Sequence, residues 1–110
     1  MTTIFSKIIS GEISADIVYK TPKIIAFKDI FPQAPTHILV VPAVPYENIL
    51  EADSDTIVEL FAVIKHLVSS LGLEKGGFRV VINTGDEGGQ TVPHLHLHLL
   101  AGRDMKWPPG

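Results

Sequence analysis

The chain has 110 residues, of which 45% are hydrophobic and 19% charged, which indicates one globular domain over residues 1–110. Its net charge of −3 argues against a general nucleic-acid-binding protein, which would show a basic face, although a small nucleotide could still occupy a local pocket. The chain contains no cysteine, so we expect no disulfide and no thiolate metal site. It shows no signal peptide and no apolar run near the roughly 18 residues of a membrane span, so we expect a cytoplasmic protein without membrane contact.

The first half of the chain is typical of a short helix followed by strands. Thr2 or Thr3 could cap a helix through Ile4 and Ile9, and Gly11 would end it. A proline-bounded turn is expected over residues 31–35. Runs of β-branched and aromatic residues predict three strands, over residues 16–20, 23–29 and 36–41.

The second half contains the strongest helix pattern, from Asp53 or Ser54 to Leu71, with Ser54 as the cap and Gly72 as the stop. The apolar stripe consists of Ile57, Leu60, Phe61, Ile64, Leu67, Val68 and Leu71. Two further strands are predicted over residues 78–83 and 95–101, on either side of a glycine-rich loop over 85–91. Short connections between strands favour antiparallel pairing, and one long helix would cover one sheet face, so the fold class is α+β.

Three histidines alternate with leucines in VPHLHLHLLAG, near the C-terminus. Because strand side chains alternate between faces, the leucines would face the helix, and His94, His96 and His98 would share the opposite face. Phe78, Val80 and Ile82 of the preceding strand would likewise lie on one side. His37 begins another strand and could join the same polar surface.

Three interpretations of the triad are open: a solvated face, a metal site and a catalytic site. A metal site is difficult because the Cβ atoms of His94 and His98 would lie ~13 Å apart on a strand. Zn–N bonds of ~2.0–2.1 Å do not converge from such a line without an acid or His37 as a further ligand. In the catalytic interpretation the middle ring, His96, attacks phosphorus, while its neighbours orient it and move protons.

The loop NTGDEGGQTVPH precedes the triad. It could be a plain hairpin connection, but Gly85, Gly88 and Gly89 would also let the backbone approach a ligand. It lacks the P-loop pattern, and no lysine or arginine follows the triad before Arg103. Histidines and backbone amides would therefore bind the anion, which favours one phosphate over a triphosphate chain.

The segment HLHLHLL fits the pattern H-φ-H-φ-H-φ-φ, where φ is hydrophobic, and resembles the histidine triad (HIT) superfamily. The segments TIFSKIISGEI, AFKDIFPQAPTHILVVP, VVINTGDEGGQT and WPPG resemble its histidine triad nucleotide-binding (Hint) branch in order and spacing. The resemblance implies a five-stranded antiparallel sheet with one long and one short helix. It also implies a homodimer whose sheet extends across the interface, with the tail 103–110 at that interface and at the active site.

The function that the resemblance implies is hydrolysis of purine nucleoside phosphoramidates. AMP or GMP and an amine would be released through a nucleotidyl-histidine intermediate, with aminoacyl adenylates as possible substrates and with no metal or other cofactor. The alternatives are a nucleotide-binding scaffold with little catalysis, a metal-binding protein and a dinucleoside polyphosphate hydrolase. The WPPG tail and the single-phosphate character of the site argue against the last of these.

The resemblance also assigns roles to individual residues. His96 matches the nucleophile and His98 the ring that contacts the phosphate, whereas His94 and His37 would support proton placement. Asp29 matches the acid that holds the ribose hydroxyls. The base pocket would include Phe5, Ile8, Phe27 and Ile30. The phosphate and leaving-group side would include Asn83, Gly89, Gln90 and Thr91, and Trp107 would reach towards the partner's active site.

Two positions depart from the eukaryotic members of the branch. Thr91 stands where serine is familiar, so a hydroxyl is kept but a methyl group is added and χ1 is stiffened. Pro93 stands where tyrosine can occur. Both lie on the leaving-group side, so they bear on which amine is accepted.

Overall fold

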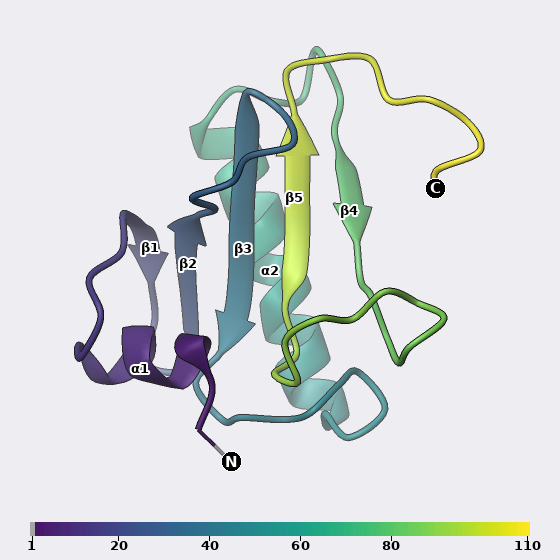
Figure 1. The fold of residues 1–110 in the computed structure, drawn as a ribbon. Helices are drawn as coiled ribbons and strands as arrows, with labels where there is room; N and C mark the ends of the chain where they lie inside the picture. Colours follow the sequence, from purple (N-terminus) through teal and green to yellow (C-terminus); the bar gives the residue numbers. More distant parts are fainter. Residues whose placement is uncertain (1) are drawn as a thin grey trace.

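The structure, a computed structural model, describes residues 2–110 and has an antiparallel sheet at its centre (Figure 1). The strand order is β1-β2-β3-β5-β4, and the strands are β1 (Ile17–Lys20), β2 (Ile24–Lys28), β3 (Thr36–Pro42), β4 (Arg79–Val81) and β5 (Leu97–Ala101). The long helix α2 (Ser54–Ser70) lies behind the sheet, and the short helix α1 (Ile4–Ser10) lies in front of the lower end of β2 (Figure 1). The predicted α+β fold is confirmed. Within residues 2–110, no helix has the length and apolar character needed to cross a bilayer.

Helix α1 begins at Thr3, which is its cap, rather than at Thr2. The Thr3 hydroxyl accepts the backbone N–H of Ser6 (3.1 Å), and the Ser6 hydroxyl accepts that of Thr3 (3.4 Å), so the two residues form a capping box. Gly11 ends the helix with φ of 85°, a conformation that glycine adopts without strain. The Thr3 hydroxyl also lies 3.1 Å from Nδ1 of His94, so the cap connects the N-terminus to the triad.

The cap of helix α2 lies one residue earlier than predicted. Asp53 has an extended backbone and accepts the Thr56 N–H on Oδ1 (2.8 Å), whereas Ser54 is already helical, so the prediction of a Ser54 cap was wrong. Its buried face consists of Leu60, Val63, Ile64, Leu67 and Val68. Phe61 and Leu71 of the predicted stripe are exposed instead. Phe61 lies at the border of the stripe at ~100° per residue, and Leu71 lies beyond the last helical residue.

The alternation of the triad segment divides its side chains between two packed layers. Leu95, Leu97 and Leu99 pack against α2, as predicted. On the other side of the sheet, a second cluster joins α1 to β2 and β3 through Phe5, Ile8, Ile25, Phe27, Leu39 and Val41. The histidines lie on this second side, where the Phe5 ring is 4.9 Å from that of His96.

Four predicted strands are shorter than expected, and the differences at β4 and β5 bear on the triad. β5 begins at Leu97, so His94 and His96 lie in the irregular segment that enters the strand, and only His98 is paired, opposite Leu39 and Val81. β4 lacks Phe78, which is 45% exposed, so the prediction that Phe78 would share the inner side with Val80 was wrong. An edge strand of three residues has no second neighbour to extend its pairing.

The double use of the Thr3 hydroxyl predicts that Thr3→Val is destabilising. The change removes the helix cap and leaves Nδ1 of the fully buried His94 without a donor. We expect the free energy of unfolding to fall by about 2 kcal/mol in urea denaturation, with Thr3→Ser close to wild type. Thr2→Val, at the exposed neighbouring threonine, is the matched control. Equal stability of the two valine variants would contradict the prediction.

Candidate active site

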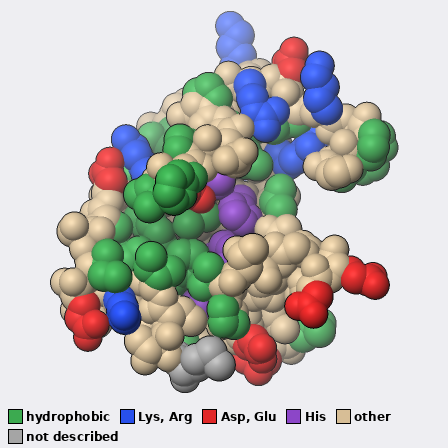
Figure 2. All heavy atoms as spheres, viewed as in Figure 1, with side chains coloured by type: hydrophobic (Ala, Val, Ile, Leu, Met, Phe, Trp, Pro, Cys, Tyr) green, Lys and Arg blue, Asp and Glu red, His purple; other side chains and the backbone are tan. Residues whose placement is uncertain are grey.

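A cavity of about 330 Å³ lies between α1, β2 and the segment that enters β5. Figure 2 shows it as a hollow with histidine at its floor and hydrophobic side chains along one wall. Eight of the predicted site residues line it: Phe5, Ile8, Phe27, Asp29, Ile30, Thr91, His96 and His98. Its volume and mainly apolar walls are typical of a small-molecule site.

A second cavity, of about 310 Å³, lies beside α2 and contains none of the predicted site residues. It is lined in part by Tyr19 and His66, whose rings stack at 4.3 Å, and by the Lys23–Glu59 ion pair. Lys23 and Glu59 are paired with each other, and the His66 ring lies against Tyr19 with no second histidine beside it, so the triad cavity is the candidate active site.

A backbone carbonyl determines the orientation and tautomer of His96. Its Nδ1 lies 2.7 Å from the carbonyl oxygen of His94, which can only accept, so Nδ1 carries the proton. In the neutral ring Nε2 then has a free lone pair. Nε2 of His96 has no hydrogen-bond partner. Among residues 2–110, every buried side-chain nitrogen and oxygen has a partner, so this Nε2 is not buried but open to the cavity. His96 is therefore a buried ring with one nucleophilic atom presented to a ligand.

His98 has the opposite tautomer, and this too can be traced to the backbone. The N–H of Gln33 donates to Nδ1 of His37 (3.0 Å), so neutral His37 carries its proton on Nε2. That proton is donated to Nδ1 of His98 (2.9 Å), which leaves the His98 proton on Nε2. His98 therefore presents an N–H donor to the cavity that His96 faces with a lone pair, and the two rings are 5.0 Å apart.

His94 is fully buried and holds its neighbours in place. Its Nε2–H donates to the carbonyl oxygen of Pro42 (2.9 Å), so Nδ1 accepts from the Thr3 hydroxyl (3.1 Å). With both nitrogens engaged inside the protein, the ring has no atom left for a ligand. Its contribution to the site is the carbonyl group that orients His96.

Burial keeps all four of these histidines neutral near pH 7. Burial, together with the neighbouring rings of His96 and His37, lowers the pKa of His98 to about 4, against the opposing charge of Asp29. Burial also lowers the pKa of His96 and of His94. The pKa of His37 is lowered by burial although Asp29 raises it. The nucleophile therefore needs no deprotonation step at neutral pH.

Asp29 lies where β2 ends and contacts both the cavity and the histidines. Its Oδ1 accepts the N–H of Phe31 (2.8 Å), and its Oδ2 lies 3.5 Å from Nε2 of His37. Oδ2 accepts no hydrogen bond from residues 2–110, and Asp29 lines the cavity, so this oxygen can accept a hydroxyl of a ligand. Lys28, the one basic residue among the described cavity-lining residues, pairs with Asp16 at 3.5 Å.

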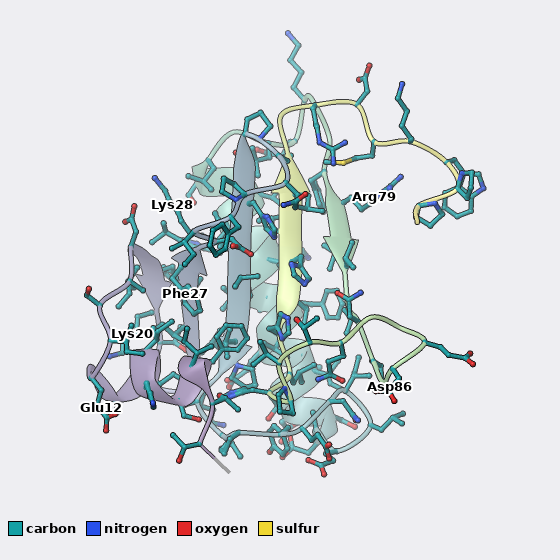
Figure 3. The ribbon with its side chains drawn as sticks, in the orientation of Figure 1. Glu12, Lys20, Phe27, Lys28, Arg79 and Asp86 are labelled. Atoms are coloured by element: carbon teal, nitrogen blue, oxygen red, sulfur yellow. The ribbon has the colours of Figure 1, made fainter. Side chains whose placement is uncertain are left out.

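Besides His37 and His94, four predicted site residues lie outside the cavity lining. Asn83 donates to the carbonyl oxygen of Gly88 (2.7 Å), and Gln90 donates to that of Glu47 (2.6 Å), so both amides hold the loop in its conformation. Gly89 lies within this loop with φ of 75°. Trp107 is 83% exposed on the C-terminal tail. Asp86 lies at the outer end of the loop, away from the triad (Figure 3), so it does not repel a phosphate there.

The structure adds cavity-lining residues that sequence reasoning missed, chiefly Phe31, Leu39 and Val92. Phe31 could have been inferred, because it follows Asp29 and Ile30 in one turn. The buried contact of Thr3 with His94 had no local signal, since the residues are 91 positions apart.

Asp29, His37 and His98 could together present three atoms to a metal, all within 4.8 Å of one another. Their hydrogen bonds oppose this use. The Gln33 N–H at Nδ1 of His37 keeps the proton on Nε2, which is the His37 atom nearest the other two residues. A zinc ion would need that lone pair, so the three residues do not fit a metal without breaking the hydrogen-bond chain.

The assigned tautomers predict a specific NMR pattern for the histidine rings. At pH 7, two-dimensional ¹H–¹⁵N spectra should show the proton on Nδ1 of His96 and on Nε2 of His37, His94 and His98. The His98 signals should stay those of a neutral ring down to near pH 4. His66, exposed on α2, provides the reference for an averaged ring. A proton on Nε2 of His96 would contradict the assignment.

The same pKa shift has a defined effect on stability. Because the pKa of His98 is about 4 in the folded chain and 6.5 in the unfolded chain, the unfolded chain binds more protons between these values. The stabilisation is therefore complete above pH 6.5 and is lost as the pH falls towards 4. Denaturation curves across this window should show a falling free energy of unfolding, and a constant value would contradict the shift.

Known proteins with this arrangement come from several groups of organisms. A hydrolase of the HIT family from Legionella pneumophila is 43% identical, with a TM-score of 0.95 over 99% of this chain and 100% of that chain. A histidine triad nucleotide-binding protein from Candida albicans is 31% identical, with a TM-score of 0.87 over 97% of this chain and 83% of that one. A maize protein named as a 14 kDa zinc-binding protein is 48% identical over 98% of this chain and 88% of its own length.

The model of the HIT domain matches residues 10–105, which include the whole triad and the strands that position it. On this match, and on the 43% identity to the Legionella protein, the chain belongs to the HIT domain family.

Proposed function

We propose that this protein hydrolyses the P–N bond of purine nucleoside phosphoramidates and releases AMP or GMP and an amine. The observation that carries the proposal is the pair of opposite tautomers in one cavity, with the lone pair of His96 beside the N–H of His98. Tetrahedral phosphorus needs an attacking atom and a donor for its charged oxygens, and the two rings supply them without a metal.

The proposed reaction has two displacements at phosphorus. In the first, Nε2 of His96 attacks phosphorus, the P–N bond breaks, and the amine leaves with a proton taken from solvent, while Nε2–H of His98 donates a hydrogen bond to a phosphate oxygen. In the second, a water molecule attacks the nucleotidyl-His96, returns a proton to solvent, and the bond from phosphorus to Nε2 breaks. Positive charge on the His96 ring is stabilised throughout by the His94 carbonyl at Nδ1–H.

The remainder of the nucleotide is proposed to lie along the apolar wall. Phe5 and Phe27, packed edge to face at 5.7 Å, would contact the base together with Ile8. The free Oδ2 of Asp29 would accept the ribose hydroxyls. With one uncommitted donor ring and no unpaired lysine or arginine among the described lining residues, the site suits a single phosphate better than a polyphosphate chain.

The names of relatives support a nucleotide hydrolase of this family more than a zinc protein. The Legionella protein is described as a hydrolase and the Candida protein as nucleotide-binding. The maize name refers to zinc, but the Gln33 N–H opposes a metal at the trio of Asp29, His37 and His98 in this chain. Activity in EDTA separates the two possibilities.

His96→Ala should abolish AMP release from adenosine 5′-phosphoramidate in EDTA. The change removes the attacking atom, so we expect kcat to fall at least about a thousandfold. His66→Ala, at an exposed histidine outside the triad cavity, is the control and should retain activity. Equal activity of His96→Ala and wild type, or no activity in wild type, would overturn the assignment of His96 or of the reaction. Loss of wild-type activity in EDTA would favour the metal.

We also propose that the protein is a homodimer that pairs through the β4 edge. On its outer side β4 pairs with no strand within residues 2–110, and Phe78 is exposed beside it. Arg79 of β4 donates to the Lys106 carbonyl oxygen (3.0 Å), which holds the tail 103–110 beside this edge (Figure 3). A second copy across β4 would bring each Trp107 near the partner.

Light scattering should therefore give twice the mass of one chain for the wild type. Phe78→Asp places a charge beside the edge strand and should shift the mass towards one chain. Leu50→Asp, at an exposed leucine outside every strand, should leave the dimer intact. A wild-type mass of one chain would refute the dimer, and a dimeric Phe78→Asp would refute this edge.

A further inference from the structure

The turn between β2 and β3 carries two large exposed apolar side chains at the mouth of the cavity. Ile30 is 77% exposed and Phe31 is 75% exposed, although both line the cavity. One exposed apolar side chain needs no explanation, because much of any protein surface is apolar. Two adjacent ones at the rim of an apolar site indicate a surface that a ligand covers.

The backbone of this turn is held at several points, so its side chains are presented from a defined position. The Asp29 N–H donates to the His37 carbonyl oxygen (3.0 Å), and the Phe31 N–H donates to Oδ1 of Asp29 (2.8 Å). The Gln33 N–H donates to His37 (3.0 Å), and Arg103 donates to the Gln33 carbonyl oxygen (2.8 Å). Ordering Phe31 against a ligand would therefore cost little backbone entropy.

We propose that the Phe31 ring is the outer wall of the base site and stacks on the purine of the bound nucleotide. This inference rests on the proposed nucleotide function and identifies a residue that determines specificity within it. Phe5 and Phe27 form the buried inner wall of the same cavity, so a base between them and Phe31 would be enclosed from both sides.

Asp29 supplies the geometric argument for a nucleoside as the occupant. One carboxylate oxygen accepts the Phe31 N–H; the other lies 3.5 Å from Nε2 of His37, and because Asp29 lines the cavity it can accept a ribose hydroxyl. The position of the ring and the position of the ribose are thus determined by the same side chain. Because base and ribose are directly bonded, a ligand held at Asp29 has its base within reach of Phe31.

Stacking predicts a preference for purines over pyrimidines. A purine offers two fused rings to the Phe31 face, whereas a pyrimidine offers one and leaves more of the phenyl ring in water. Since the contact is the same in the ground state and in the transition state, it should appear in KM and leave kcat unchanged.

The test compares Phe31→Ser and Phe31→Tyr with wild type on adenosine and cytidine 5′-phosphoramidates. Phe31→Ser should raise KM for the adenosine substrate about tenfold at unchanged kcat, and should raise KM for the cytidine substrate less. Phe31→Tyr should retain the wild-type values. Leu50→Ser removes a large exposed apolar side chain that lies outside both the cavity and the β4 edge, and is the control. Unchanged KM in Phe31→Ser, or a fall in kcat alone, would overturn the proposal.

Calorimetry with AMP and with ribose 5-phosphate separates failure of this inference from failure of the proposed reaction. Phe31→Ser should bind AMP about tenfold more weakly and bind ribose 5-phosphate as wild type does. Equal weakening of both ligands would mean that the turn and Asp29 had moved, and would refute stacking. A wild type that binds AMP without hydrolysing phosphoramidates would refute the reaction alone, whereas one that binds no AMP would refute both.

Discussion

The site depends on the hydrogen bond from Nδ1 of His96 to the carbonyl oxygen of His94, at 2.7 Å. A carbonyl cannot donate, so this contact determines which nitrogen carries the proton and which faces the cavity. The carbonyl is itself positioned, because the His94 ring is held between Pro42 at the end of β3 and Thr3 at the start of α1. The position of Nε2 of His96 thus depends on β3 and α1, which act through the buried His94 ring, and that ring does not contact the ligand.

A cavity with neutral imidazoles handles a phosphate differently from one with lysines and arginines. Burial lowers the pKa of each of the four histidines, so within residues 2–110 the triad offers oriented N–H groups and lone pairs but no fixed positive charge. Oriented dipoles in an apolar surrounding stabilise charge that develops during reaction, with little reorganisation. The same burial therefore makes the site a poor binder of highly charged polyphosphate chains and a good stabiliser of one reacting phosphate.

Much of this arrangement could be predicted from local patterns. Period-two alternation was enough to place Leu95 and Leu97 in the core and His96 on the opposite side. Contacts between distant residues could not be predicted: nothing near Thr3 indicates His94, and nothing near Gln90 indicates that its amide reaches Glu47. Several residues match a resemblance but have other contacts in the folded chain, and the roles of Asn83, Gly89, Gln90 and Trp107 towards a ligand stay predictions.

The alternating segment from His94 to Leu99 has a consequence for how this protein can change. Every second residue belongs to the core against α2, and the residues between them belong to the cavity side. An insertion or deletion of one residue here would exchange the two sets, placing imidazoles against α2 and leucines at the floor of the cavity. A substitution can change one face of this segment without affecting the other. A change in the length of the segment, in contrast, alters the core and the active site together.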